Sequence, residues 1–124
     1  MMPAVCREAH IVARREHRCC ECGGTIQPLD VYERTVGLWE GGWDTFKVCL
    51  GCEEARDFYV EHFADGRDPD DGQFSFTALF ADLMDAVWDL PNGKRFEGLR
   101  HLAKMRIRNR LAKENRMAKK GGAT

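Results

Sequence analysis

The sequence predicts an α+β fold in which a short β-hairpin lies between two cysteine pairs and helices follow. The pairs have the spacing Cys-x-x-Cys, at Cys19–Cys22 and Cys49–Cys52. Two runs of β-branched and aromatic residues, separated by glycines, lie between the pairs and are typical of a hairpin. After the second pair, apolar residues recur at helical spacing. With 124 residues, 44% of them hydrophobic, the chain can bury the core of one domain or of two small modules.

The four paired cysteines have the pattern of a structural metal site. Zinc prefers four soft ligands in a tetrahedron, and each Cys-x-x-Cys turn presents two thiolates to one ion. The 26 residues between Cys22 and Cys49 are enough for one hairpin. We therefore expect one structural Zn²⁺, held by Cys19, Cys22, Cys49 and Cys52. Sites of this kind supply roughly 10–16 kcal/mol of apparent binding energy, so residues 14–66 are expected to need the metal in order to fold.

Other uses of the cysteine pairs fit less well. A thioredoxin-like redox pair would lie beside a βαβ unit, which the sequence does not predict. A rubredoxin-like iron site would have glycine after both pairs, whereas only the first is followed by Gly23 and Gly24. A closed shell of four thiolates leaves no open position for catalysis, so we do not expect an enzyme or a small-molecule substrate. Cys6 and Cys20 exceed the four ligands; burial as small apolar residues is favoured over metal binding, and their role stays open.

The predicted hairpin consists of strands at residues 31–39 and 43–48, joined by a glycine-containing turn. A helix is predicted to begin at Glu53, because acidic residues suit a first helical turn, and to end near Gly66. Residues 1–18 carry no firm signal. The zinc module is therefore assigned to residues 1–66.

A two-helix part is predicted to follow a linker at residues 67–73, where turn-forming residues gather. It spans residues 74–118, and residues 119–124 form a frayed tail. The first of its helices begins at Ser75 or Thr77 and stops at residues 91–93. The apolar positions expected in its core are Phe76, Leu79, Phe80, Leu83, Met84, Val87 and Trp88. The second helix runs from about residue 94 to 117, with apolar residues along one side: Phe96, Leu99, Ala103, Ile107 and Leu111.

Charge is distributed unevenly along the chain. Residues 1–52 carry a net charge of −1, residues 53–93 carry −9 and residues 94–124 carry +9. An acidic block followed by a basic one is typical of a chain with an interaction segment. Alternatively the two blocks neutralise each other, with Asp82, Asp85 and Asp89 facing the basic helix.

The cations of the last helix are candidate nucleic-acid ligands. They are Arg100, Lys104, Arg106, Arg108, Arg110 and Lys113. Three of them stack at i, i+4 and i+8, and such a row can follow phosphates while releasing condensed counterions. A protein partner, or a merely solvated face, remains an alternative. The helix is expected to lie outside the cysteine module.

Two tryptophans, Trp39 and Trp43, flank the predicted hairpin turn. They are candidate partner-binding residues, because tryptophan is enriched at binding hot spots. The alternative is that they pack across the hairpin or on a neighbouring helix.

The N-terminus lacks the apolar run of a signal peptide, and no stretch downstream is long and apolar enough to span a membrane. These features predict a cytoplasmic protein with reduced thiols and no membrane partner.

The order of cysteine turn, hairpin and helix resembles a treble-clef zinc finger. Residues 13–56 more closely resemble small zinc-binding proteins encoded by tailed phages and prophages. This resemblance rests on residues 13–26, on residues 32–34 and 42–47, and on the closing cysteine pair. It implies a zinc-stabilised fold but no established activity. With a phage origin, the protein would act in the host cytoplasm, where it could dock on a host complex such as a defence system. Its acidic segment, residues 53–93, could then imitate nucleic acid on a basic partner surface.

Nucleases of the HNH kind also use the treble-clef fold, with a histidine base and a metal-binding histidine or asparagine around the hairpin. Residues 23–48 contain neither residue type. The sequence therefore does not predict a nuclease.

Overall fold

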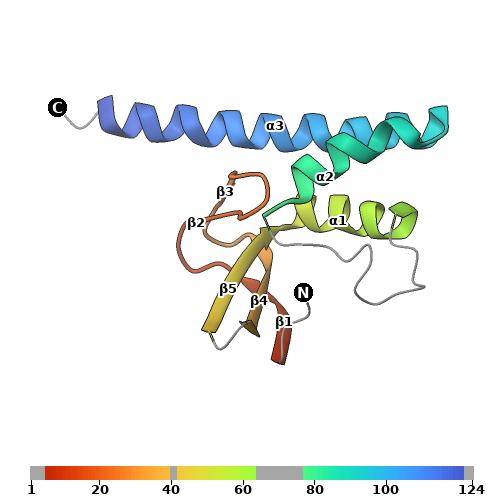
Figure 1. Cartoon of the computed structure of the whole chain (residues 1–124). Coiled ribbons are helices and arrows are strands. Elements are labelled where there is room, and N and C mark those ends of the chain that lie inside the picture. The colour runs from red at the N-terminus through yellow and green to blue at the C-terminus, as the bar shows by residue number, and fades with distance from the viewer. Residues whose placement is uncertain (1–4, 40–41, 64–76, 122–124) are drawn as a thin grey trace.

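The computed structural model describes residues 5–39, 42–63 and 77–121. In these parts, antiparallel strands form a small sheet and three α-helices pack beside it, so the predicted α+β class is confirmed. Figure 1 shows the sheet on one side of a long C-terminal helix, with two shorter helices beside them. The predicted linker at residues 67–73 and the proposed cap at Gly66 lie outside the described residues.

The main sheet has three strands in the order β1-β4-β5. β4 (Val31–Trp39) has the predicted bounds, and β5 (Gly42–Cys49) extends the prediction by one residue at each end. The strand β1 (Val5–Val12) was not predicted. It pairs antiparallel with β4, and Ile11 lies opposite Tyr32.

The first cysteine pair lies in a tight turn between two very short strands. β2 (His17–Arg18) and β3 (Thr25–Ile26) pair antiparallel, and the turn between them contains Cys19 to Gly24. The N–H of Cys19 donates to the carbonyl oxygen of Gly24 at 2.9 Å. Gly23 has a φ of 73°, a conformation that glycine adopts without steric cost. We refer to residues 19–24 as the cysteine turn.

The three helices begin at positions that differ from the predicted ones. α1 (Leu50–Phe63) begins three residues before Glu53, directly after β5. α2 (Leu79–Ala86) continues into a 3₁₀ turn, η1 (Val87–Asp89), and α3 spans Asn92–Gly121. Residues 91–93 were predicted to end the helix that precedes them. They also begin α3, because proline is well tolerated at a helix start. The carbonyl of Pro91 accepts the N–H of Arg95 at 2.7 Å.

The prediction for the core of α2 is largely confirmed. Leu79, Leu83 and Val87 are fully buried, and Phe80 and Met84 are half-buried. Trp88, however, is 58% exposed, so its assignment to the core was wrong. The chain tightens into the η1 turn here, and three residues per turn rotate Trp88 away from the apolar stripe. Phe76 lies outside the described residues.

The buried face of α3 is not the predicted one. Phe96, Ile107 and Leu111 are exposed, whereas Leu102, Met105 and Ala112 are buried. The buried side also includes Gly98, where a Cβ would lie 2.6 Å from Val87 Cγ2. The rotation of α3 therefore brings Gly98 against η1 and leaves most of the predicted apolar stripe in solvent.

One cluster of buried residues connects the strands with all three α-helices. Ile26, Val48 and Ala55 contribute to it from β3, β5 and α1, and Leu79 and Met105 from α2 and α3. All four paired cysteines belong to or pack against the same cluster. The metal-ligand candidates are therefore part of the hydrophobic core.

Candidate metal centre

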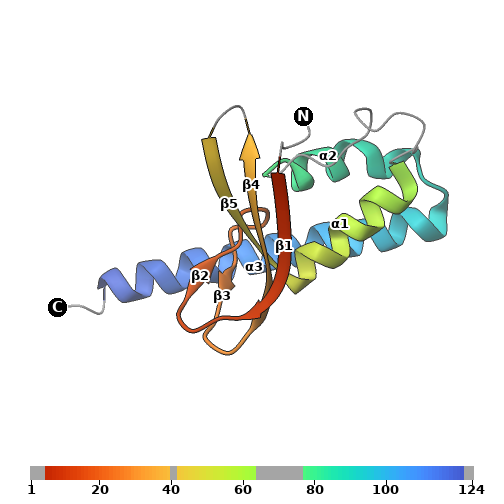
Figure 2. The same ribbon diagram turned by 90° about the horizontal axis from the view of Figure 1, so that it is seen from below.

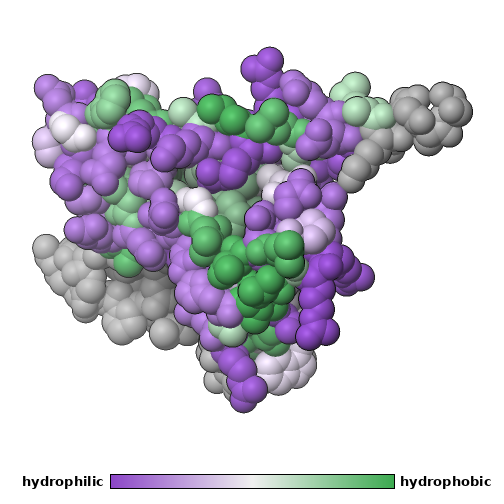
Figure 3. All heavy atoms as spheres, turned by 180° about the vertical axis from the view of Figure 1, so that it is seen from behind, coloured by the Kyte–Doolittle hydropathy of each residue, from purple (hydrophilic) through white to green (hydrophobic). Residues whose placement is uncertain are grey.

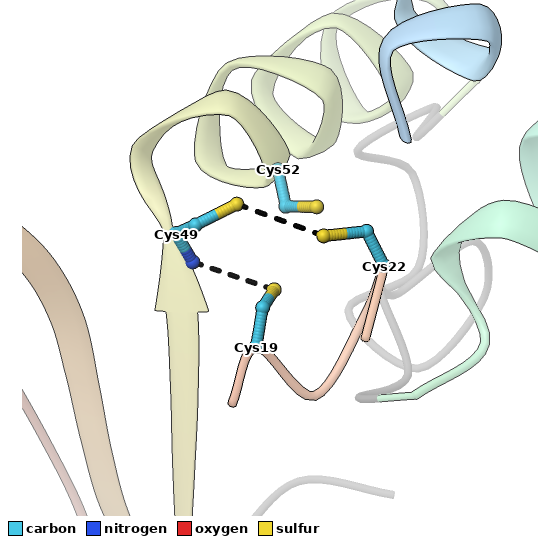
Figure 4. A group of neighbouring side chains, drawn as sticks. All are labelled: Cys19, Cys22, Cys49 and Cys52. Atoms are coloured by element: carbon cyan, nitrogen blue, oxygen red, sulfur yellow. Dashed lines mark hydrogen bonds between the residues drawn. The ribbon is translucent and has the colours of Figure 1, made fainter. Parts of the chain in front are cut away.

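The four paired cysteines converge on one point. Figure 4 shows Cys19 and Cys22 on the cysteine turn, Cys49 at the end of β5 and Cys52 on α1, with their sulfur atoms directed toward one another. All four Sγ atoms lie within 4.8 Å of one another. Zinc–sulfur bonds of about 2.3 Å in a tetrahedron require sulfur atoms about 3.8 Å apart. The Cys22 and Cys49 sulfurs are 3.9 Å apart, so the cluster can hold one metal ion, and its donor set suits zinc.

Backbone N–H groups point at two of these sulfurs. Glu21 and Cys49 each donate an N–H to Cys19 Sγ at 3.4 Å, and Gly24 donates to Cys22 Sγ at 3.2 Å. Hydrogen bonds to a thiolate favour the charged form that binds metal. The pKa of Cys22 is lowered, because the Cys19, Cys49 and Cys52 side chains hydrogen-bond to it. Hydrogen bonding with Cys19 and Cys22 raises the pKa of Cys49 and Cys52, because the four sulfurs compete for protons. The backbone N–H groups are therefore what favours thiolates at Cys19 and Cys22.

A cation of α3 also contacts the cysteine cluster. Arg108 donates from Nε to Cys22 Sγ at 3.4 Å and from Nη2 to Cys52 Sγ at 3.3 Å. Burial alone would lower the pKa of Arg108, but its hydrogen bonds to Cys22 and Cys52 raise the pKa further above its ordinary value. A zinc ion with four thiolates carries a net charge of −2, and this guanidinium offsets part of it.

This contact corrects the expectation that the last helix lies outside the cysteine module. Asn109 strengthens the attachment by donating from Nδ2 to the Cys22 carbonyl oxygen at 2.7 Å. The helix comes so close that a Cβ on Gly24 would lie 2.9 Å from Arg108 Cβ. A Cβ on Gly23 would lie 2.5 Å from Asn109 Nδ2. Both glycines are therefore required by the docking of α3, and Gly23 also by its φ.

Glu21, inside the cysteine turn, attaches α2 to the centre. Its carboxylate accepts the N–H of Thr77 at 3.0 Å and of Leu79 at 3.2 Å. Ala78, at the N-cap of α2, makes no side-chain capping bond, so Glu21 takes that role from a distant part of the chain. Burial raises the pKa of Glu21, while the two backbone bonds act in the opposite direction. Neither Glu21 nor Arg108 was identified at the metal centre from the sequence.

The surplus residues near the centre do not join the four ligands. Cys20 is half-buried with Sγ 3.8 Å from Glu21 Oε2, and burial raises the pKa of its thiol. The ring of His17 packs on Tyr32 at 5.2 Å, and its Nδ1 lies 3.1 Å from Lys47 Nζ. The side chain of Cys6 lies outside the described residues.

A second group of potential ligands, His10, Glu33 and Glu53, lies where β1 and β4 face α1. Arg56 donates to both carboxylate oxygens of the buried Glu33. His10 Nε2 lies 2.7 Å from one Glu53 oxygen and 2.8 Å from the other. The carboxylates are therefore already engaged with cationic or hydrogen-bonding partners, and the group ties α1 to the sheet.

The predicted nucleic-acid cations fall into two groups. Arg108 is half-buried at the metal centre, whereas the others are exposed: Arg100, Lys104, Arg106, Arg110 and Lys113. Arg110 pairs with Glu114 on its own helix at 3.2 Å. Within the described residues, no ion pair joins these cations to Asp82, Asp85 or Asp89.

The two predicted partner-binding tryptophans lie at the far end of the hairpin from the metal centre. Trp43 is 63% exposed and is opposite Leu38 in the sheet. Trp39 ends β4, and its side chain is outside the described part of the chain.

Comparison of the chain with protein-family models, with curated proteins and with solved structures finds no match. Among the helices within the described residues, none has the length and apolar character that crossing a membrane requires.

Proposed function

We propose that this chain is a non-enzymatic accessory protein in which zinc is a structural scaffold and α3 binds nucleic acid or a nucleoprotein. The observation that carries the proposal is that α3 is attached to the metal centre on one side and also carries cations exposed to solvent. One side is attached to the cysteine cluster through Arg108 and Asn109, while Arg100, Lys104 and Lys113 are exposed to solvent.

Electrostatics supports a polyanionic ligand. The 30 residues of α3 extend about 45 Å, and its C-terminal end reaches past the rest of the described chain (Figures 1 and 2). Exposed cations along such a rod can contact successive phosphates, and each contact releases condensed counterions. Within the described residues, the carboxylates of α2 do not pair with Arg100, Lys104 or Lys113. The positive charge of these three side chains therefore remains available to a ligand.

The scaffold role follows from the donor set. Four thiolates complete the coordination of one zinc ion and leave no position for a substrate or an activated water. The order of cysteine turn, hairpin and helix supports a treble-clef scaffold, as in the phage and prophage proteins that residues 13–56 resemble. On this proposal the protein acts in the host cytoplasm without catalytic activity.

Salt-dependent binding tests the proposal. Labelled DNA and RNA are titrated with the zinc-loaded protein at two salt concentrations, and affinity is expected to fall steeply with salt. The triple variant Arg100→Glu, Lys104→Glu, Lys113→Glu should abolish binding to all sequences alike, because phosphate contacts position a protein without specifying sequence. Arg108 is left unchanged because it contacts the metal centre.

A matched control reverses three exposed cations elsewhere, Arg7→Glu, Arg14→Glu and Arg34→Glu, with the same change in net charge. This control should keep most of the affinity. Equal losses in both variants, or absence of binding at low salt, would contradict the proposal.

A second candidate function, a protein-interaction module that modulates a host complex, is favoured by the exposure of Trp43. Tryptophan at an interface commonly contributes more than about 2 kcal/mol. In that case Trp43→Ala should reduce partner capture from the native cell while leaving nucleic-acid binding unchanged.

A further inference from the structure

Four apolar side chains form an exposed patch near the metal centre. They come from the end of β1, the loop before β4, the start of β4 and the start of α1: Val12, Leu29, Val31 and Leu50. Val31 and Leu50 also line a cavity of about 260 Å³. Figure 3 shows apolar side chains gathered on the face of the molecule below α3. We call these four residues the Leu29 patch.

Leu29 is held in a backbone conformation that leucine rarely adopts. Asp30 donates its N–H to the Gln27 carbonyl at 3.0 Å, and Leu29 has a φ of 77°, as in the third position of a type II turn. Glycine or asparagine is usual at this position, and a residue with a branched side chain there is strained. The side chain is nevertheless 82% exposed, so packing within the chain does not compensate for the strain.

An acidic face continues from this patch along α1. Glu54, Asp57 and Glu61 follow Leu50 on the solvent-exposed side of the helix at i+4, i+7 and i+11. Asp30, at the edge of the same cavity, is also exposed. The surface thus combines apolar side chains with a row of carboxylates.

The solvent-exposed side of α3, which we call the α3 crest, combines apolar side chains with cations. It therefore complements the apolar and acidic surface just described. Ile107 and Leu111 are exposed one turn apart, and the exposed cations Arg100 and Lys104 precede them on the same side of α3. Figure 3 shows apolar side chains between hydrophilic ones along α3. This crest cannot reach the Leu29 patch of its own chain, because the opposite side of α3, with Leu102 and Met105, packs on the body.

From this complementarity we propose that the α3 crest of one copy docks on the Leu29 patch and acidic α1 face of a second copy. An amphipathic helix would place Ile107 and Leu111 against the patch and its cations against the carboxylates. Two different surfaces meet, so the contact is head-to-tail and builds chains or rings. It uses cations on which the proposed function also rests, so nucleic acid and a second copy compete for α3.

The first test measures the molar mass of the zinc-loaded protein by sedimentation at about 50 mM and about 500 mM salt, since screening shortens the range of these charges. At low salt the mass should exceed that of one chain and rise with concentration, and at high salt it should approach one chain. A protein that stays monomeric at low salt and high concentration overturns the proposal. A dimer of fixed mass that is insensitive to salt also overturns it.

Charge exchange identifies the two surfaces. One variant carries Arg100→Glu and Lys104→Glu, and the other carries Glu54→Lys, Asp57→Lys and Glu61→Lys. Each should be monomeric alone, because like charges then face each other, and an equimolar mixture should associate again. Failure of the mixture to associate overturns the pairing.

Leu29→Gly separates docking from folding. Glycine relieves the positive φ and removes the apolar anchor, so the melting temperature should be maintained while self-association weakens by about tenfold or more. Unchanged association would overturn the role of the Leu29 patch. The α1 variant keeps every cation of α3, so its nucleic-acid affinity reports on the proposed function independently of self-association.

Discussion

Arg108 shows how one side chain can connect a distant helix to a metal centre. Its guanidinium donates to the sulfurs of Cys22 and Cys52, so it both offsets the charge of the thiolates and fixes the rotation of α3. The sequence assigned this residue to the same basic row as Arg100 and Lys104. Periodicity places these three residues near one another on a helix, but it does not reveal which of them faces a neighbouring element.

Removing this guanidinium should weaken metal binding. Groups that hydrogen-bond to metal ligands typically contribute about 10–100-fold to affinity, so Arg108→Ala should lose zinc at a lower chelator concentration by about that factor. Chelator competition with a zinc-sensitive dye measures the shift. Lys104→Ala, one turn away and exposed, is the matched control and should behave as the unmodified protein. Equal zinc retention in both variants would assign Arg108 no role at the centre.

The ion pair between Glu33 and Arg56 should make the stability of the fold depend on pH. Hydrogen bonds from Arg56 lower the pKa of Glu33 in the folded state, and they outweigh the opposing effect of burial. In the unfolded chain a glutamate titrates near about 4.3. The ion pair therefore stabilises the fold fully above that pH, and its contribution is lost as the pH falls through the lower folded-state pKa.

The variant Glu33→Gln isolates this contribution. At neutral pH it should reduce the free energy of unfolding by about 3 kcal/mol, because it leaves the charge of Arg56 without its buried carboxylate. The difference from the unmodified protein should begin to shrink below pH ~4, and it should vanish only when the pH has fallen past the lowered pKa of Glu33 in the folded state. Denaturant unfolding of both proteins across this pH range measures the gap, and a constant gap would contradict the assignment. Acid also protonates the thiolates and releases zinc, so the gap is measured at each pH at which both proteins still hold the metal.

At the scale of elements, the sequence predicted β4 correctly but missed β1 and the buried face of α3. A run rich in β-branched and aromatic residues, followed by a glycine-containing turn, predicted β4 with its bounds. The strand β1 was missed because charged residues and histidine interrupt its apolar positions, and only pairing with β4 stabilises it. The buried face of α3 was misassigned because close approach of Gly98 to η1 and the bond from Asn109 to the cysteine turn outweigh the burial of larger apolar residues.

Capping of α2 by Glu21 is a long-range contact that local sequence does not reveal. Replacing Glu21 by alanine removes the acceptor for the N–H groups of Thr77 and Leu79, and should cost about 1–2 kcal/mol. Glu21→Gln keeps one side-chain oxygen and should cost less. Hydrogen exchange should show faster exchange in α2 in the alanine variant, with zinc content unchanged. Glu8→Ala, which removes an exposed carboxylate from β1, is the control; if it has the same effect, the loss does not come from the cap.

At the scale of the molecule, the cysteines were predicted from their spacing alone, because a thiolate pair needs only local sequence to form half of a zinc site. What the sequence did not reveal is how far the influence of the centre extends. Met105 of α3 and Leu79 of α2 lie in the same buried cluster as Cys19 and Cys52. The metal was expected to be needed for residues 14–66, but these contacts extend its influence to the helices that follow.

Removal of the metal should therefore unfold the described chain as a unit. Without zinc, three buried thiols, the half-buried thiol of Cys49 and the half-buried charge of Arg108 remain at the core, and binding energy of roughly 10–16 kcal/mol is lost. Strong chelation should abolish the near-ultraviolet circular dichroism and the protection of α3 amides at the same chelator concentration, with about one zinc released per chain. Cys22→Ser and Cys49→Ser should give the same unfolded state, whereas Cys20→Ser should keep both zinc and fold. Protection of α3 that survives metal removal would mean that the helices fold independently of the centre.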